Sequence, residues 1–284
     1  MLTVNWPDQH PVNAAMAELA TLPAKGISRI IIDIGANLDP IQSPGNDTLV
    51  LAIEPVVHAG IRRRPRLLVV PAAVSDSDGV ANMSVYSSRG GASRQEASSL
   101  SPLRTANGEM QIGSQLPVPL LSASRMFASI PKEMSVVLLK TDMQNHDFSI
   151  VRATGDALRR VRRIKNEVDL KAGVAGGYVN QSNDICNDFM PYMSRRGFVL
   201  TCLITGRHSQ QIVLARNPEH LEAFCSRRQR NTGTRWANTA NVAGTNRSAG
   251  LPRWWGDAYW TRHDLLTTGS CDPCSCVGRR ALRA

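Results

Sequence analysis

The chain has 284 residues, enough for one large α/β domain or for a domain of about 200 residues with an appendage. Its hydrophobic fraction is 42%, and no stretch approaches the roughly 18 uninterrupted apolar residues of a membrane helix, which argues against a membrane-spanning protein. The formal net charge is +10, of which +7 comes from ten arginines and three aspartates after Cys225. The basic character therefore belongs mainly to the C-terminal end and indicates little about partners of the remainder.

The first predicted elements are a helix over residues 10–22 and a strand over residues 29–34. The β-branched run of this strand is typical of a strand buried on both faces of a parallel sheet. Asp33 and Gly35 stand where the strand ends, which is the edge at which open α/β sheets bind ligands. Gly35 permits a sharp turn and a close approach to a ligand, and Asn37 tolerates left-handed backbone. We therefore predict a ligand-binding turn.

A second apolar run over residues 48–53 predicts the next strand, and it ends in Glu54. Glu54 follows Asp33 by 21 positions, close to the offset of about 20 at which nucleotide-binding α/β units place an acid on a ribose hydroxyl. The prolines and glycine in the intervening segment 39–47 break the helix that such units start directly after the turn.

The rest of the chain alternates predicted strands and helices. We expect strands over 66–70, 81–86, 118–122, 136–142, 163–168, 198–204 and 211–215, and helices over 123–130, 148–158 and 185–194. The segment 87–115 is rich in Ser, Gly and Arg and predicts an exposed loop over the ligand-binding end of the sheet. The alternation predicts an α/β fold with a mainly parallel sheet, closed by an antiparallel hairpin over residues 198–215.

We divide the chain into a helical lead-in over 1–27, a domain over 28–222 and a basic, irregular tail over 223–284. The tail is either poorly ordered or docked on the core through the aromatic residues of segment 254–260. Cys186, Cys202 and Cys225 are far apart in sequence, which is typical of reduced cytosolic thiols. The first residues show no signal peptide, so we predict a cytoplasmic protein. Three cysteines over 271–276 lack a fourth ligand, so we predict no metal site.

Several motifs together resemble the FkbM family of S-adenosylmethionine-dependent methyltransferases. They are IIDIGANLDP at 31–40, LAIEP at 51–55, PAAVSDSDG at 71–79, ASSL at 97–100, LLKTDMQNHD at 138–147 and KNEV at 165–168. The resemblance covers roughly residues 28–216. It implies a Rossmann-like methyltransferase fold, S-adenosylmethionine as cofactor, and methylation of a hydroxyl oxygen on a small molecule or sugar.

The resemblance also implies which residues bind the cofactor. The methionine end would be lined by Asp33, Gly35 and Asn37, the ribose hydroxyls would bind Glu54, and the adenine would be flanked by Ser75 and Asp76. The alternatives without a ligand are that Asp33 caps a helix and that Glu54 is a solvated strand end.

Two residues are candidates for the catalytic base. The resemblance places Asp142 beside the transferred methyl, and a carboxylate can take the proton of an attacking hydroxyl. His146 has an ordinary pKa suited to the same role, or it is simply a polar residue at the start of a helix. Ser98 and Ser99 either contact the cofactor or substrate or lie in a plain loop.

The sequence leaves two other functions open. The family has a glycine at the position of Asp39 and an acid at the position of Gln144, and these departures favour a non-catalytic relative with weak or no cofactor binding. A second alternative is a nucleic-acid-associated protein that acts through its arginine-rich tail. A nicotinamide dehydrogenase is disfavoured because the turn after residue 34 lacks the full G-x-G-x-x-G pattern.

Overall fold

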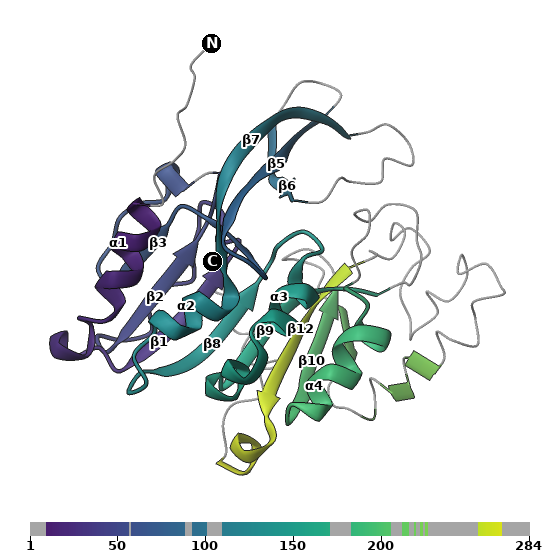
Figure 1. Ribbon diagram of the computed structural model, residues 1–284. Coiled ribbons are helices and arrows are strands. Elements are labelled where there is room, and N and C mark those ends of the chain that lie inside the picture. Colours follow the sequence, from purple (N-terminus) through teal and green to yellow (C-terminus); the bar gives the residue numbers. More distant parts are fainter. Residues whose placement is uncertain are drawn as a thin grey trace. The chain divides into compact units, whose positions relative to one another are not determined.

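A computed structural model describes residues 10–56, 58–88, 93–100, 110–170, 183–205, 212–215, 219, 222–223, 225–226 and 255–268 (Figure 1). Contacts within the chain divide the described residues into two units, one that ends at Lys165 and one that begins at Asn166.

The first unit contains a parallel sheet whose strand order is β8-β1-β2-β3. Its strands are β1 (Arg29–Ile34), β2 (Thr48–Ile53), β3 (Leu67–Val70) and β8 (Ser135–Thr141), each close to the predicted bounds. From β1 the chain adds β2 and β3 on one side and then returns to add β8 on the other. The order therefore reverses between β1 and β8, and in open α/β sheets ligands bind outside the carboxyl ends of the strands at such a reversal.

Burial confirms that β1 and β2 are central strands. All residues of β2 are buried, and in β1 only Arg29 is not. Helices α1 (His10–Leu19) and α2 (Ala123–Ser129) contact each other and cover one face of these strands (Figure 1). Leu19 and Phe127 are 0% and 1% exposed, so each stabilises the fold by about 1.5–3 kcal/mol through burial.

A second sheet in the first unit corrects the predicted loop over 87–115. Its order is β4-β7-β5-β6, from β4 (Ala73–Ser75), β5 (Gly79–Ser88), β6 (Ser93–Ser99) and β7 (Met110–Ser122). Strands β5 and β7 pair antiparallel along nearly their whole length, and Figure 1 shows them as one long, curved ribbon pair. Residues 112–116 are all exposed, so the first half of β7 lacks the apolar alternation that identifies a strand in the sequence, whereas its second half is the strand predicted over 118–122.

Two predicted helices are each divided into two helical segments in the structure. The helix expected over 148–158 is α3 (Asp147–Ala153), followed by a 3-10 helix over Gly155–Arg160, and the left-handed Gly155 (φ 58°) separates them. The helix expected over 185–194 is a π-helix over Ile185–Phe189 continued by α4 (Met190–Arg195). Three further short 3-10 helices span Pro23–Lys25, His58–Gly60 and His263–Thr268.

In the second unit, strand β10 (Phe198–Thr205) lies between two antiparallel neighbours, β11 (Ile212–Ala215) and β12 (Trp255–Arg262). The β10–β11 pair confirms the predicted hairpin. Strand β12 lies in the expected irregular tail, and its Trp260 is 2% exposed. Of the two alternatives for the tail, poor order or docking through its aromatic residues, docking is therefore correct for β12. The preceding strand β9 (Arg163–Asp169) starts in the first unit, beside β8.

The prediction of reduced cysteines is wrong. Cys186 and Cys225 form a disulfide across 39 positions, and Cys202 is also disulfide-bonded. Distance along the sequence does not limit pairing, because the fold brings the Cα atoms of Cys186 and Cys225 to 5.5 Å. Disulfides are typical of oxidising compartments, so the cytoplasmic prediction loses the support of its cysteine argument. Within the described ranges, no helix is long and apolar enough to cross a membrane.

Candidate functional site

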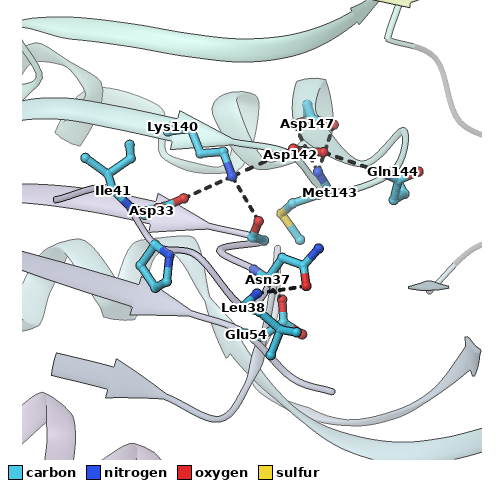
Figure 2. Close-up of polar contacts among 12 residues, drawn as sticks. Asp33, Asn37, Leu38, Ile41, Glu54, Lys140, Asp142, Met143, Gln144 and Asp147 are labelled. Atoms are coloured by element: carbon cyan, nitrogen blue, oxygen red, sulfur yellow. Dashed lines mark hydrogen bonds and ion pairs between the residues drawn. The ribbon is translucent and has the colours of Figure 1, made fainter. Parts of the chain in front are cut away.

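Asp33 lies near the carboxyl end of β1 and is 1% exposed. Its Oδ2 accepts a hydrogen bond from the backbone N–H of Ile41 at 2.8 Å, and its Oδ1 lies 3.0 Å from Lys140 Nζ (Figure 2). The parallel register places Asp33 directly beside Lys140 on β8. Both carboxylate oxygens therefore contact other parts of the chain, and Asp33 supports the loop after β1 rather than capping a helix.

Gly35 forms the turn after β1 with a left-handed φ of 68°. A Cβ atom at this position would lie 2.0 Å from the carbonyl oxygen of Asp142, so only glycine fits. The close approach that the sequence indicated is thus made to the backbone of the turn after β8. The N–H groups of Gly35 and Ala36 donate to the carbonyl of Ile53, at 3.0 Å and 3.4 Å.

Glu54 follows β2 and is 7% exposed, so it is not a solvated strand end. Its Oε2 accepts from the backbone N–H of Asn37 at 3.0 Å, and its Oε1 accepts from that of Val56 at 2.9 Å. Asn37 has the left-handed φ of 51° that the sequence suggested, and its Oδ1 accepts from the N–H of Leu38 at 2.8 Å (Figure 2). The two predicted residues, Asn37 and Glu54, are therefore in direct contact.

The segment after Asn37 is a fixed loop in place of the usual helix. Arg64 donates from Nη2 to the carbonyls of Pro40 and Ile41, the latter at 3.0 Å, while Asp33 holds the N–H of Ile41. Leu38 and Asp39 remain exposed at the tip of the loop, Leu38 with 56% of its surface. The loop is thus anchored from both the β1 side and the β3 side of the sheet.

Asp142 follows β8, and its side chain is 44% exposed. Its backbone N–H donates to the carbonyl of Ile34 at 3.1 Å. Its Oδ1 accepts from Gln144 Nε2 at 3.3 Å, and its Oδ2 lies 3.7 Å from Lys140 Nζ. From the sequence, no role was assigned to Lys140, although the motif at 138–147 contains this residue. The signal that could have identified it is the parallel pairing of β1 with β8, which sets a lysine beside a buried acid.

The turn after β8 contains two consecutive non-glycine residues with positive φ, Gln144 (51°) and Asn145 (78°). Such residues cost of order 1–3 kcal/mol each and persist only where the surroundings hold them. Here the buried carboxylate of Asp147 accepts the N–H of Met143 through both oxygens at 3.3 Å, and Ser99 Oγ donates to the carbonyl of Gln144 at 3.2 Å. Ser99 therefore contacts the site from the end of a strand, not from a loop.

His146 directly precedes α3, and its carbonyl accepts from the N–H of Ile150 at 3.1 Å. Burial lowers the pKa of His146 below its ordinary 6.5, and the nearby charge of Asp76 raises it by a smaller amount. Asp76 is exposed, and its Oδ1 accepts from Ser75 Oγ at 3.3 Å just after β4. The fold therefore brings His146 and Asp76, which the sequence assigned to different tasks, within electrostatic reach of each other.

The predicted residues thus form two groups. One group lies at the carboxyl ends of β1, β2 and β8 and comprises Asp33, Gly35, Asn37, Glu54 and Asp142. The other lies where β4 contacts α3 and comprises Ser75, Asp76 and His146. In the part of the chain that the structure describes, no set of three or more His, Cys, Asp or Glu side chains is placed to hold a metal ion.

The chain matches no protein-family model, no curated protein and no solved structure.

Proposed function

We propose that the chain binds S-adenosylmethionine at the carboxyl ends of β1, β2 and β8 and transfers its methyl group to a hydroxyl oxygen of a small molecule or sugar. The site lies at the strand-order reversal, where doubly wound sheets bind ligands. Glu54, after β2, is placed to accept hydrogen bonds from a ribose, and the half-exposed Asp142, after β8, is placed to contact the reacting hydroxyl. The motifs that resemble the FkbM family contribute all of these residues.

The observation that carries the proposal is where the N–H groups of the turn point. A dinucleotide or other pyrophosphate ligand needs several backbone N–H groups at a helix N-terminus. Here the N–H groups of Gly35, Ala36, Asn37, Leu38 and Ile41 all donate to acceptors of the chain itself. Pro40 has no N–H. The turn therefore suits a nucleoside ligand without phosphates, as S-adenosylmethionine is.

In the proposed reaction the hydroxyl oxygen attacks the methyl carbon in line with the carbon–sulfur bond. The bonding electrons stay on sulfur, which converts the sulfonium to the thioether of S-adenosylhomocysteine. The hydroxyl proton leaves to a base, and Asp142 is our first candidate because its side chain is half-exposed at the end of β8. His146 is the second, since a lowered pKa keeps its imidazole neutral and able to accept a proton at pH 7.

One observation favours the non-catalytic alternative. Asp142 already contacts Lys140 and the amide of Gln144, and the amide stands where the family has an acid. Asp142 therefore already has one hydrogen bond and one charge contact within the chain, which supports a fold that binds the cofactor without turning it over. The arginine-rich tail lies largely outside the described residues, and the nucleic-acid alternative rests on its composition alone.

Isothermal titration calorimetry with S-adenosylhomocysteine, and separately with NADH and ADP-ribose, tests the proposal. We expect binding of S-adenosylhomocysteine and none of the two pyrophosphate ligands. Tighter binding of NADH or ADP-ribose, or no binding of S-adenosylhomocysteine at millimolar concentration, would refute it.

Asp39→Asn refines the test, because Asp39 is exposed and its carboxylate would face the α-carboxylate of the ligand's methionine end. Removing one like charge is worth about 1 kcal/mol in a partly screened site, which corresponds to roughly fivefold tighter binding. Glu133→Gln is the matched control, since Glu133 is an exposed acid just before the amino end of β8. Equal effects of both variants would mean that only net charge matters and that the ligand lies elsewhere.

A further inference from the structure

We infer that Lys140 is a positioning residue that sets the geometry of the site by joining the carboxyl ends of β1 and β8. This inference rests on the proposed function for what the site binds, but the contacts that support it do not depend on the ligand.

Three acceptors surround the ammonium of Lys140. Nζ donates to the carbonyl of Gly35 at 2.9 Å, lies 3.0 Å from Asp33 Oδ1 and lies 3.7 Å from Asp142 Oδ2 (Figure 2). The lysine side chain is 13% exposed and the Asp33 side chain 1%, so the ammonium is enclosed at the strand-order reversal. Lys140 thus contacts both the turn after β1 and the acid after β8.

The three contacts differ in kind. The two short ones fix the buried Asp33 and the Gly35 turn, because a lysine ammonium has three N–H donors that can align with acceptors at this distance. The contact with Asp142 is too long for a direct hydrogen bond and acts through charge alone. Lys140 therefore orients the Asp142 carboxylate without an N–H bonded to its Oδ2, the oxygen that we expect to meet the substrate hydroxyl.

The charges explain why a lysine is placed here. Asp33 has lost nearly all contact with water, and an unpaired buried carboxylate is strongly unfavourable. Pairing with Lys140 offsets part of that penalty, and the same ammonium also contacts the Gly35 carbonyl and Asp142. Stability should therefore depend on the Asp33–Lys140 charge match, whereas ligand binding should depend on Lys140 itself.

Four variants separate these two roles: Lys140→Arg, Lys140→Met, Asp33→Asn and the double variant Asp33→Asn/Lys140→Met. The readouts are the melting temperature and the affinity for S-adenosylhomocysteine by calorimetry. Lys140→Met should lower both, with at least a tenfold loss of affinity, because Asp33 is left unpaired and the turn is released. Lys140→Arg should recover most of the affinity, since it keeps the charge.

The double variant is decisive. It should regain most of the melting temperature lost in Lys140→Met, because no unpaired buried charge remains, yet it should keep the tenfold loss of affinity. Asp33→Asn alone should lower the melting temperature less than Lys140→Met does, because the asparagine leaves no unpaired buried carboxylate. Wild-type affinity in the double variant would overturn the positioning role.

Amide hydrogen exchange separates a failure of this inference from a failure of the proposed function. The N–H of Asp142 donates to Ile34 across the β1–β8 junction, so its exchange should accelerate in Lys140→Met and in the double variant but not in Asp33→Asn. This readout needs no ligand. Unchanged exchange in Lys140→Met would refute the role of Lys140, whereas absence of wild-type binding would refute only the cofactor.

Discussion

Gly35→Ala tests whether the turns after β1 and β8 are in backbone contact. A Cβ at residue 35 would lie 2.0 Å from the Asp142 carbonyl oxygen and 2.9 Å from its carbonyl carbon. Both atoms belong to the backbone, so no side-chain rotation relieves the overlap, and one of the two turns must move by more than 1 Å to reach an ordinary contact distance of roughly 3.4 Å.

Two costs add in this variant. Placing alanine at a φ of 68° costs about 1–2 kcal/mol in backbone strain. Displacing packed backbone adds a further cost, typically about 1–3 kcal/mol for an overpacked site. The free energy of unfolding should therefore fall by about 2–5 kcal/mol.

Gly26→Ala is the matched control, because Gly26 has a φ of 76° and no atom within 4 Å of a built Cβ. It should cost only the strain of about 1–2 kcal/mol. Urea denaturation monitored by circular dichroism gives both values. If the two variants lose equal stability, the contact between the two turns does not exist as described.

Three other perturbations address the rest of the chain. Removing the Cys186–Cys225 disulfide in the double variant Cys186→Ser/Cys225→Ser should lower the free energy of unfolding by about 4 kcal/mol for a 39-residue separation, measured by urea denaturation without reductant. The His146 imidazole should titrate below pH 6.5 in NMR spectra, and Asp76→Asn should lower its pKa further. Because the folded state disfavours the imidazolium, stability should be full above pH 6.5 and decline as the pH falls, less so in His146→Gln. Arg64→Ala should accelerate amide exchange in the loop 37–41, since it removes the contacts of Arg64 to two loop carbonyls.

The parallel strands of the fold could be predicted because each is a short apolar run bounded by turn residues. Strand β2, for example, is buried along its whole length and reads as an unbroken apolar run. Only the second half of strand β7 was predicted, as the strand over 118–122. Its first half could not be predicted, because the exposed residues 112–116 carry no apolar alternation and are ordered by pairing with β5. Strand β12 escaped prediction for a different reason, since it is isolated in an arginine-rich region and pairs with β10 more than 50 positions earlier.

The candidate site was predictable at residue level only where one residue type meets a local backbone need. Asn37 and Gly35 have the left-handed φ values that their types suggested. The partners of Asp33, by contrast, are Ile41 in the next loop and Lys140 on β8, a strand that is far from β1 in the sequence. Those contacts depend on which strands are neighbours in the sheet, and strand pairing cannot be read from a single sequence.

The residue types in the turn after β8 meet the geometry that the turn requires. Asn145 has a φ of 78°, a left-handed backbone conformation that asparagine tolerates better than most residues with a Cβ. The amide of Gln144 donates from Nε2 to Asp142 Oδ1, where a carboxylate at the same position would repel Asp142. Gln144 therefore orients the side chain of Asp142 at the end of β8 by a hydrogen bond to one oxygen, while the Lys140 ammonium lies 3.7 Å from the other.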